Sequence, residues 1–181
     1  GDGGLAIEAS FCNISRLASD DQNVYIADEG NFVIRAVNKL TGMVSTIVGT
    51  GVKGYTGDDG PARLARITSV NGLAVNREMG VLFFSSTSKD LLVSGSIRAV
   101  NLTSGIVSKV IGNGVAGNRG DNGPYTRARV FFPYALTSRM GKLLCFGDVQ
   151  LTHIRCIDFQ TGNISTVAGY SIDGSTQTRT E

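Results

Sequence analysis

The sequence has no tryptophan, a single histidine and only three cysteines among its 181 residues. One imidazole, His153, cannot supply a site built from several histidines, and Cys12, Cys145 and Cys156 are too few and too widely spaced for a zinc framework. No Gly-x-Ser-x-Gly nucleophile turn is present, and no histidine-containing triad can be assembled from these residues. We therefore assign no catalytic residue, no metal site and no cofactor to this sequence.

Long hydrophobic runs and a strong charge of either sign are also missing. No apolar run approaches 18 residues, which argues against a membrane span, and no signal-peptide pattern precedes Gly1. The 17 basic and 15 acidic side chains are spread along the chain, whereas nucleic-acid binding usually shows a clustered basic face. Because the sequence starts inside a repeat without an initiator Met, we interpret it as a segment of a longer protein.

Glycine is abundant, and its positions reveal a repeat. A Gly-Asp turn, an Ile-Arg pair, a Thr/Ser-Gly turn and a further Gly follow one another three times, in units of about residues 1–56, 57–119 and 120–181. A period near 60 is typical of propellers and related arrays. The Gly-Asp turns are Gly1–Gly4, Gly57–Gly60 and Gly120–Gly123; the pairs are Ile34-Arg35, Ile97-Arg98 and Ile154-Arg155; the later glycines are Gly49, Gly112 and Gly169.

Each unit is predicted to form four short antiparallel strands. Segments rich in Val, Ile, Tyr and Phe alternate with turn residues, and no segment has a convincing helical pattern. Four strands joined by tight turns, and covered by neighbouring sheets, make one blade of an all-β propeller. The predicted strands are 14–18, 24–28, 32–38 and 44–49 in unit one, 70–75, 81–86, 96–102 and 106–112 in unit two, and 133–138, 143–148, 153–159 and 164–169 in unit three.

The run from Val24 to Asn31, followed by Ile34-Arg35 and then by Val44–Gly51 and Gly57–Ala62, resembles the NHL repeat. This resemblance implies a partial β-propeller of three NHL-type four-stranded blades, half of a six-bladed ring. Three blades are too few to close a ring, so either further blades exist or two copies pair. We expect the natural chain to continue.

The recurring Arg and Asp residues are predicted to be structural. Counting across the hairpins places Arg35 near Asp28 and Arg155 near Asp148, where each pair can hold two strands together. Arg98 lacks this acid, because serine replaces it, and must either find another partner or remain free. Asp58 and Asp121 belong to Gly-Asp-x-Gly turns, which we interpret as backbone turns because calcium and phosphate loops need ligands or a helix that are missing.

Unit two is about six residues longer than the others, and the excess falls between Thr87 and Gly95. Insertions in repeats usually map to loops on one face, often the binding face. A plain hairpin extension is the alternative that we favour, but the loop is also our candidate binding surface. Its residues are Lys89, Asp90, Leu91, Leu92 and Val93.

Two further features concern chemical modification. Cys145 and Cys156 are predicted to face each other directly across a hairpin, either as a disulfide or, as we favour, as two packed thiols. Asn13, Asn101 and Asn163 begin glycosylation sequons, of which chance alone would give about two; the compartment stays open, with a lean toward a secreted or cell-surface protein. His153 starts a predicted strand opposite Asp148, where a structural hydrogen bond is favoured over catalysis.

These observations predict a binding scaffold that presents loops to a protein or peptide partner. Two alternatives are carried forward. Some propellers that resemble this repeat are lyases or hydrolases, and further blades would have to complete such a site. Others bind RNA, which would require a contiguous basic surface with stacking aromatic side chains.

Overall fold

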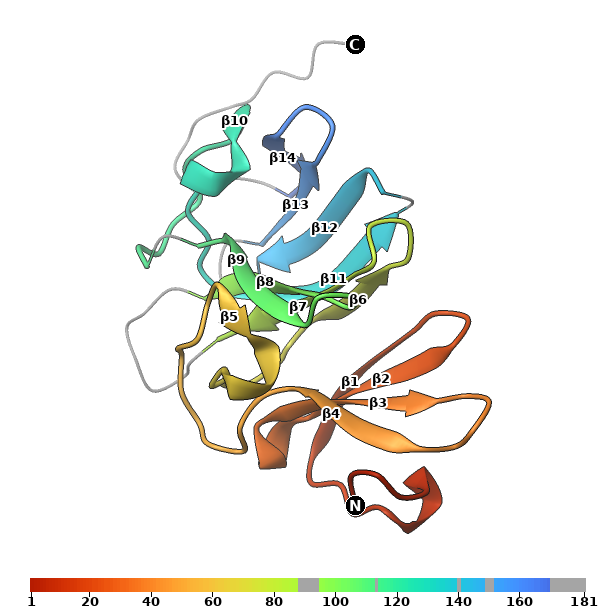
Figure 1. Ribbon diagram of the computed structural model, residues 1–181. Helices are drawn as coiled ribbons and strands as arrows, with labels where there is room; N and C mark the ends of the chain where they lie inside the picture. Colours follow the sequence, from red (N-terminus) through yellow and green to blue (C-terminus); the bar gives the residue numbers. More distant parts are fainter. Residues whose placement is uncertain (88–94, 113, 140, 149–151, 170–181) are drawn as a thin grey trace.

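The computed structural model describes residues 1–87, 95–112, 114–139, 141–148 and 152–169, which form three antiparallel sheets (Figure 1). Sheet one contains β1 (Ile14–Ser19), β2 (Asn23–Asp28), β3 (Val33–Asn38) and β4 (Val44–Val48). Sheet two contains β5 (Gly60–Pro61), β6 (Leu73–Asn76), β7 (Val81–Ser86), β8 (Ser96–Asn101) and β9 (Ile106–Ile111). Sheet three contains β10 (Gly123–Pro124), β11 (Pro133–Arg139), β12 (Leu143–Asp148), β13 (His153–Asp158) and β14 (Asn163–Ala168).

Helical structure is confined to single 3-10 turns within the described ranges. They are η1 (Ala6–Glu8), η2 (Glu29–Asn31), η3 (Ala62–Leu64) and η4 (Tyr125–Arg127). None of the helices in the described residues has the length and apolar character needed to cross a membrane. The prediction of an all-β chain is confirmed.

The sheets are arranged like a fan around their innermost strands. Strand β6 packs beside both β1 and β11, while the outer strands β4, β9 and β14 diverge (Figure 1). Within each sheet the four principal strands follow one another as an antiparallel meander, in the order that the sequence predicted. The chain then crosses from the outer strand of one sheet to the inner strand of the next.

The structure differs from the prediction in three strands, β5, β10 and β6. In sheets two and three a two-residue strand, β5 or β10, adds to the outer edge, and such a short Gly-Pro segment carries no strand pattern. Strand β6 begins at Leu73 instead of Val70. The reason is that the carbonyl oxygens of Val70 and Asn71 accept hydrogen bonds from Ser15 and Arg16 of sheet one.

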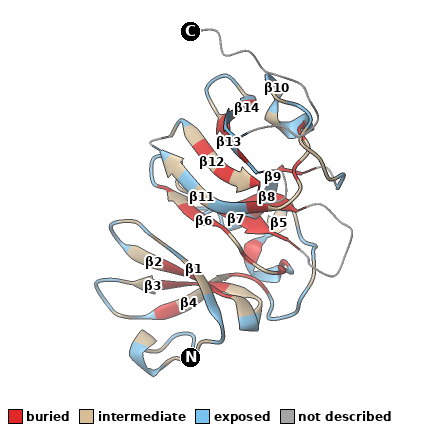
Figure 2. Cartoon of the chain, turned by 180° about the vertical axis from the view of Figure 1, so that it is seen from behind, coloured by how far each residue is buried: buried red, intermediate tan, exposed pale blue. Residues whose placement is uncertain are grey.

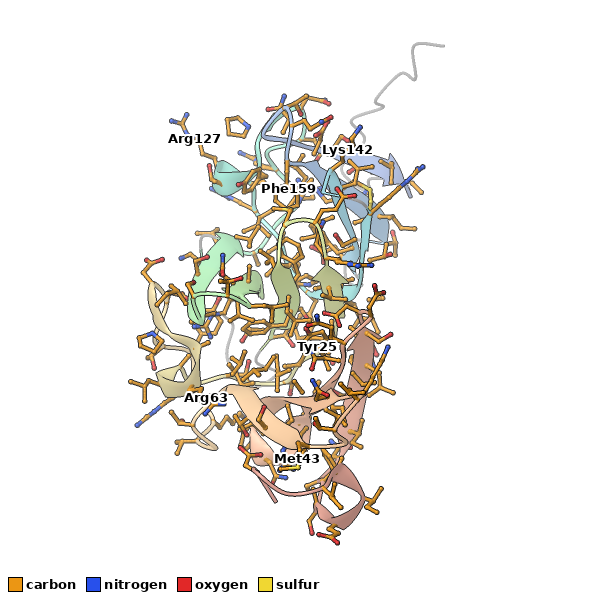
Figure 3. All side chains as sticks on the ribbon, turned by 45° about the vertical axis from the view of Figure 1, so that its right-hand side comes forward. Tyr25, Met43, Arg63, Arg127, Lys142 and Phe159 are labelled. Carbon is orange, nitrogen blue, oxygen red and sulfur yellow. A yellow bond between two sulfur atoms is a disulfide. The ribbon has the colours of Figure 1, made fainter. Side chains whose placement is uncertain are left out.

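Facing sheets bury the apolar side chains between them. Tyr25, Ile34 and Val48 of sheet one meet Leu82 and Phe84 of sheet two in one cluster. A second cluster lies between sheets two and three, where the ring of Phe159 stacks on that of Phe83 at 5.6 Å. Figure 3 shows Tyr25 at the first junction and Phe159 at the second.

The repeat extends to backbone detail. In every sheet the ladder between the third and fourth strands slips by one residue at the Ile-Arg pair, which is a β-bulge. The glycine that ends the fourth strand has a positive φ in all three copies, 102° at Gly49, 109° at Gly112 and 102° at Gly169. A Cβ at Gly49 would lie 2.4 Å from the carbonyl oxygen of Phe32, so the close approach of the two strands requires glycine.

Cys145 and Cys156 lie directly opposite each other on β12 and β13, with their Cα atoms 4.0 Å apart, and form a disulfide. The predicted register of this hairpin is confirmed. Our preference for two free thiols was wrong, because the direct pairing brings the sulfur atoms within bonding distance. Cys12 is free and exposed.

The outer sheets each have one face that no other described sheet covers (Figure 2). The isoleucine of the repeated Ile-Arg pair shows the difference in exposure between the sheets. Ile34 and Ile97 are completely buried against the next sheet, whereas Ile154 of sheet three is 48% exposed. Burial of apolar surface of this kind drives association between molecules.

We therefore expect the isolated chain to self-associate through the uncovered faces of sheets one and three. The variant Ile154→Asp places a charge on the uncovered face of sheet three and should shift the monomer–oligomer equilibrium toward monomer in sedimentation velocity. Leu40→Asp is the matched control, because Leu40 is 94% exposed in the turn between β3 and β4. A chain that stays monomeric at every concentration, or an equal effect of both variants, would contradict this expectation.

Candidate functional site

The candidate loop Lys89–Val93 lies outside the described residues. Its flanking residues Thr87 and Gly95 follow β7 and precede β8. Because the strands of a meander alternate in direction, this end of sheet two corresponds to the end of sheet one that carries the turn between β2 and β3.

At that end of sheet one, an open groove of about 900 Å³ lies on the face that points away from sheet two. The buried side chains Asp28 and Arg35 line it together with half-buried Val33. Arg63 stands at the groove on η3, which Figure 3 shows next to the ribbon of sheet one. The remaining lining residues are Gly1, Asp2, Ser10, Gly30, Asn31, Phe32, Thr46, Gly49, Thr50 and Gly51.

Arg35 organises this groove. Its Nε and Nη2 atoms donate hydrogen bonds to Asp2 Oδ1 at 3.1 and 2.8 Å, and Nη1 donates to the carbonyl oxygen of Ser10 at 3.0 Å. The second oxygen of Asp2 accepts a hydrogen bond from the Thr46 amide at 2.8 Å. The ring of Phe11 lies 4.8 Å from the guanidinium carbon. These contacts tie the N-terminal turn to β3 and β4.

The same arrangement recurs in the other two sheets. Arg98 donates to Asp58 at 2.7 Å and to the carbonyl oxygen of Arg66 at 3.1 Å. Arg155 donates to Asp121 at 2.9 and 2.6 Å, and to the carbonyl oxygen of Arg129 at 2.6 Å. Both guanidinium groups are completely buried. Each Gly-Asp-x-Gly turn therefore supplies the counter-charge for the arginine of its own unit.

The predicted Arg35–Asp28 ion pair is present, with 3.6 Å between Nη1 and the carboxylate, but it is longer than the pair with Asp2. Asp28 mainly accepts hydrogen bonds from the Cys12 amide and the Asn31 side chain. Arg98 is not an exception, because its acid comes from Asp58 instead of from the hairpin.

Asp148 likewise has a role other than the predicted one. Its two carboxylate oxygens accept hydrogen bonds from the Phe131 and Phe132 amides, at 2.7 and 2.9 Å, while Arg155 binds Asp121. In sheet two, where Ser86 replaces the acid, its hydroxyl bonds to that of Thr68 at 3.0 Å. The acid of the hairpin thus fixes the segment that leads into the innermost strand.

The environments of two aspartates shift their pKa values in opposite directions. Burial by itself raises the pKa of Asp2, but the hydrogen bonds from Arg35 and Thr46 outweigh it and leave that pKa below the ordinary 3.8. Burial also raises the pKa of Asp148, and here the two amide hydrogen bonds and the nearby Arg155 and His153 do not reverse it.

His153 pairs with Asp148 in the β-ladder, as predicted. Its Nδ1 atom is buried and has no hydrogen-bond partner within the described residues, so the expected structural hydrogen bond is not made through this atom. No group of three or more His, Cys, Asp or Glu side chains that could hold a metal ion occurs in the described part of the chain. The sequon residues Asn13, Asn101 and Asn163 are all exposed.

Sequence reasoning missed the groove and the partners of the arginines. The Asp–Arg separations are 33, 40 and 34 residues, and their variation hides the pairing from any search for fixed spacing. The signal that could have revealed it is the recurrence of one Asp and one Arg in every unit.

Comparison with known proteins supports the fold. No family model matches the chain. It is 32% identical over 95 residues, 52% of its length, to the protein SUPPRESSOR OF QUENCHING 1, chloroplastic, of Arabidopsis thaliana. A crystal structure of a protein of unknown function from Bacteroides thetaiotaomicron matches 74% of the chain with a TM-score of 0.60 and 21% identity. TolB from Acinetobacter baumannii matches 87% of it with a TM-score of 0.55 and 13% identity.

The two solved structures are propeller-like. The chain has the fold of a partial β-propeller. It spans 8% of the length of the Arabidopsis protein and about a third of each solved structure, 32% and 33%. Sheets one, two and three are therefore propeller blades, and their innermost strands line the axis about which blades are arranged.

The Arg–Asp contacts predict a stability difference between two neighbouring acids. Asp58→Asn removes the counter-charge of the buried Arg98 and should lower the free energy of unfolding by about 1–2 kcal/mol, measured by urea denaturation. The adjacent Asp59→Asn is the control, because Asp59 is exposed and has φ 63°, a conformation that Asn tolerates; its effect should stay within about 0.5 kcal/mol. Equal effects would show that the Asp58–Arg98 contact does not stabilise the fold.

The two shifted aspartates predict opposite pH effects. Asp2 stabilises the folded chain above pH 3.8, and this contribution is lost as the pH falls through its lowered pKa. Asp148 stabilises the fold most when protonated, and its contribution is lost as the pH rises above 3.8 through its raised pKa. Carboxyl carbon NMR titration should place the midpoint of Asp2 below 3.8 and that of Asp148 above it. The reverse order would refute the assigned causes.

Proposed function

We propose that this propeller segment is a scaffold that binds a protein or peptide partner at the end of the blades that carries the groove. The observation that carries the proposal is the open groove of about 900 Å³ beside the β2–β3 turn of sheet one. The extension of unit two, which includes Lys89–Val93, is inserted into the corresponding turn of the neighbouring blade. A groove and a loop at one end of a propeller together suit an extended ligand.

The composition of the groove favours a peptide over a nucleic acid. Asp2 and Asp28 lie beside Arg35, so the groove offers both charges together with backbone donors and acceptors. A phosphate backbone would be repelled by the two carboxylates, whereas a peptide can pair with groups of either sign. The resemblance of the three sequence units to the NHL repeat further supports a scaffold of the NHL type.

The proposal can be tested by selecting binders from a displayed library of random peptides. We expect selected peptides to perturb the backbone amide NMR signals of the groove, and Thr50→Trp, which fills the groove from its exposed rim, to abolish binding. Leu40→Trp, at the opposite end of sheet one, is the matched control and should bind normally. Peptides that bind both variants equally would disprove the site. Protection of the same amides by a single-stranded RNA, with no peptide selected, would favour the RNA-binding alternative.

A further inference from the structure

One guanidinium near the axis of the blades has only neutral partners within the described ranges. Arg16 lies on the innermost strand β1, where its Nε donates a hydrogen bond to the carbonyl oxygen of Asn71 at 2.9 Å and its Nη1 donates to that of Ser15 at 2.6 Å. Its guanidinium carbon lies 4.5 Å from the centre of the Tyr134 ring, on the innermost strand β11. These contacts join units one, two and three at the place where the three blades converge.

The charge of Arg16 is left unpaired, in contrast to the arginines of the Ile-Arg pairs. Arg35, Arg98 and Arg155 each contact an aspartate, at 2.8, 2.7 and 2.6 Å. Arg16 forms no ion pair with any Asp or Glu of the described residues, although it is half-buried. Carbonyl oxygens accept from two of its five N–H donors, and the other three have no acceptor in the same part of the chain. A half-buried cation of this kind favours an added carboxylate.

Backbone irregularities direct both side chains to this place. Strand β1 has a β-bulge just before Arg16, and β11 has one just after Tyr134. Ala135, the unpaired residue of the second bulge, has φ 49°, a conformation that alanine rarely adopts. Its amide donates to the carbonyl oxygen of Asn71 at 3.0 Å, the same oxygen that accepts from Arg16. Bulges re-aim side chains and are frequent beside functional sites, where strained residues also gather.

The place lies at the mouth of the axial channel and not on the face of an outer sheet. The ladders pair Ile14 with Asp28 and Pro133 with Asp148, so β1 and β11 begin at the end of the blades that carries the β2–β3 turn. Closed propellers surround a central channel, so this place stays accessible in a complete ring. Tyr134 is 38% exposed, and its hydroxyl has no hydrogen-bond partner among the described residues.

The free donors suit a carboxylate better than a phosphate group. Two N–H groups of a guanidinium match the two oxygens of a carboxylate in a planar, bidentate contact. The single positive charge of Arg16 balances a carboxylate, whereas a phosphate group carries a charge of about −2 at neutral pH. The Tyr134 hydroxyl can donate a further hydrogen bond to the same ligand. Polypeptides offer carboxylates at Asp and Glu side chains and at the C terminus.

We propose that Arg16 and Tyr134 form a carboxylate-binding site at the mouth of the axial channel, which recognises a C-terminal or side-chain carboxylate of a partner polypeptide. The free donors of Arg16 bind the two carboxylate oxygens, and the Tyr134 hydroxyl donates to one of them. This inference rests on the proposed function for the kind of partner, but the site is separate from the groove and does not require it.

Three N-acetylated tripeptides provide the probes: Ala-Ala-Ala with a free C terminus, the same peptide with an amidated C terminus, and amidated Ala-Asp-Ala. We expect the two carboxylate peptides to shift the Arg16 Nε–H and Tyr134 ring signals in NMR titrations of the intact chain. The amidated Ala-Ala-Ala peptide should bind at least tenfold more weakly, because hydrogen bonds to a charged group contribute a factor of ten or more. The tighter of the two carboxylate peptides shows which source the site prefers.

Variants separate this site from the rest of the molecule. Arg16→Gln should weaken binding of the carboxylate peptides to the level of the amidated one, and Tyr134→Phe, which keeps the ring, should weaken it several-fold. Arg77→Gln removes an exposed arginine that pairs with Asp21; it is the matched control and should bind normally. Thr50→Trp fills the groove and should also leave this binding unchanged, so a failure of the groove is distinguishable from a failure of this site.

Equal binding of the free and amidated Ala-Ala-Ala peptides would overturn the inference, and this comparison stays decisive even if Arg16→Gln does not fold. Tighter binding of inorganic phosphate than of either carboxylate peptide would also contradict it. So would carboxylate binding that survives unchanged in Arg16→Gln or Tyr134→Phe, because the contact with Arg16 and Tyr134 would then be purely structural.

Discussion

A buried guanidinium in the third strand of every sheet constrains the whole structure. Arg98 and Arg155 have no exposed surface, so each requires a counter-charge and several acceptors within the fold. Asp58 and Asp121 meet this need, together with the carbonyl oxygens of residues 66 and 129. The five N–H donors of arginine point in fixed directions. The segment between two blades, which carries the aspartate and the carbonyl acceptor, must therefore cross the edge of the sheet where these groups meet the guanidinium. The crossing between blades is thereby fixed.

The same constraint holds in sheet one. Arg35 is buried and has its acid and its carbonyl partner in Asp2 and Ser10, as Arg98 has Asp58 and the carbonyl oxygen of Arg66. The second oxygen of Asp2 accepts a hydrogen bond from the Thr46 amide, so the N-terminal turn is tied to both outer strands of the sheet.

The hairpin acids show how one position can change its chemistry while keeping its role. Asp28 and Asp148 accept amide hydrogen bonds from the segment that leads into the innermost strand, and Ser86 binds the same segment through a hydrogen bond between its hydroxyl and that of Thr68. The carboxylates lie without solvent contact, which is costly unless amides satisfy their oxygens. Position in the blade, more than residue identity, determines the function of this side chain.

The sequence by itself determined the blades. The spacing of Gly-Asp turns, Ile-Arg pairs and glycines placed the principal strands and the direct Cys145–Cys156 pairing, because strand period and turn chemistry are local properties. Only the tertiary structure decided that Arg35 binds Asp2, that Pro61 joins a strand, and that a groove opens beside Val33. These contacts join residues separated by 30 residues or more, or depend on which neighbouring sheet covers a face. No local pattern in the sequence encodes them.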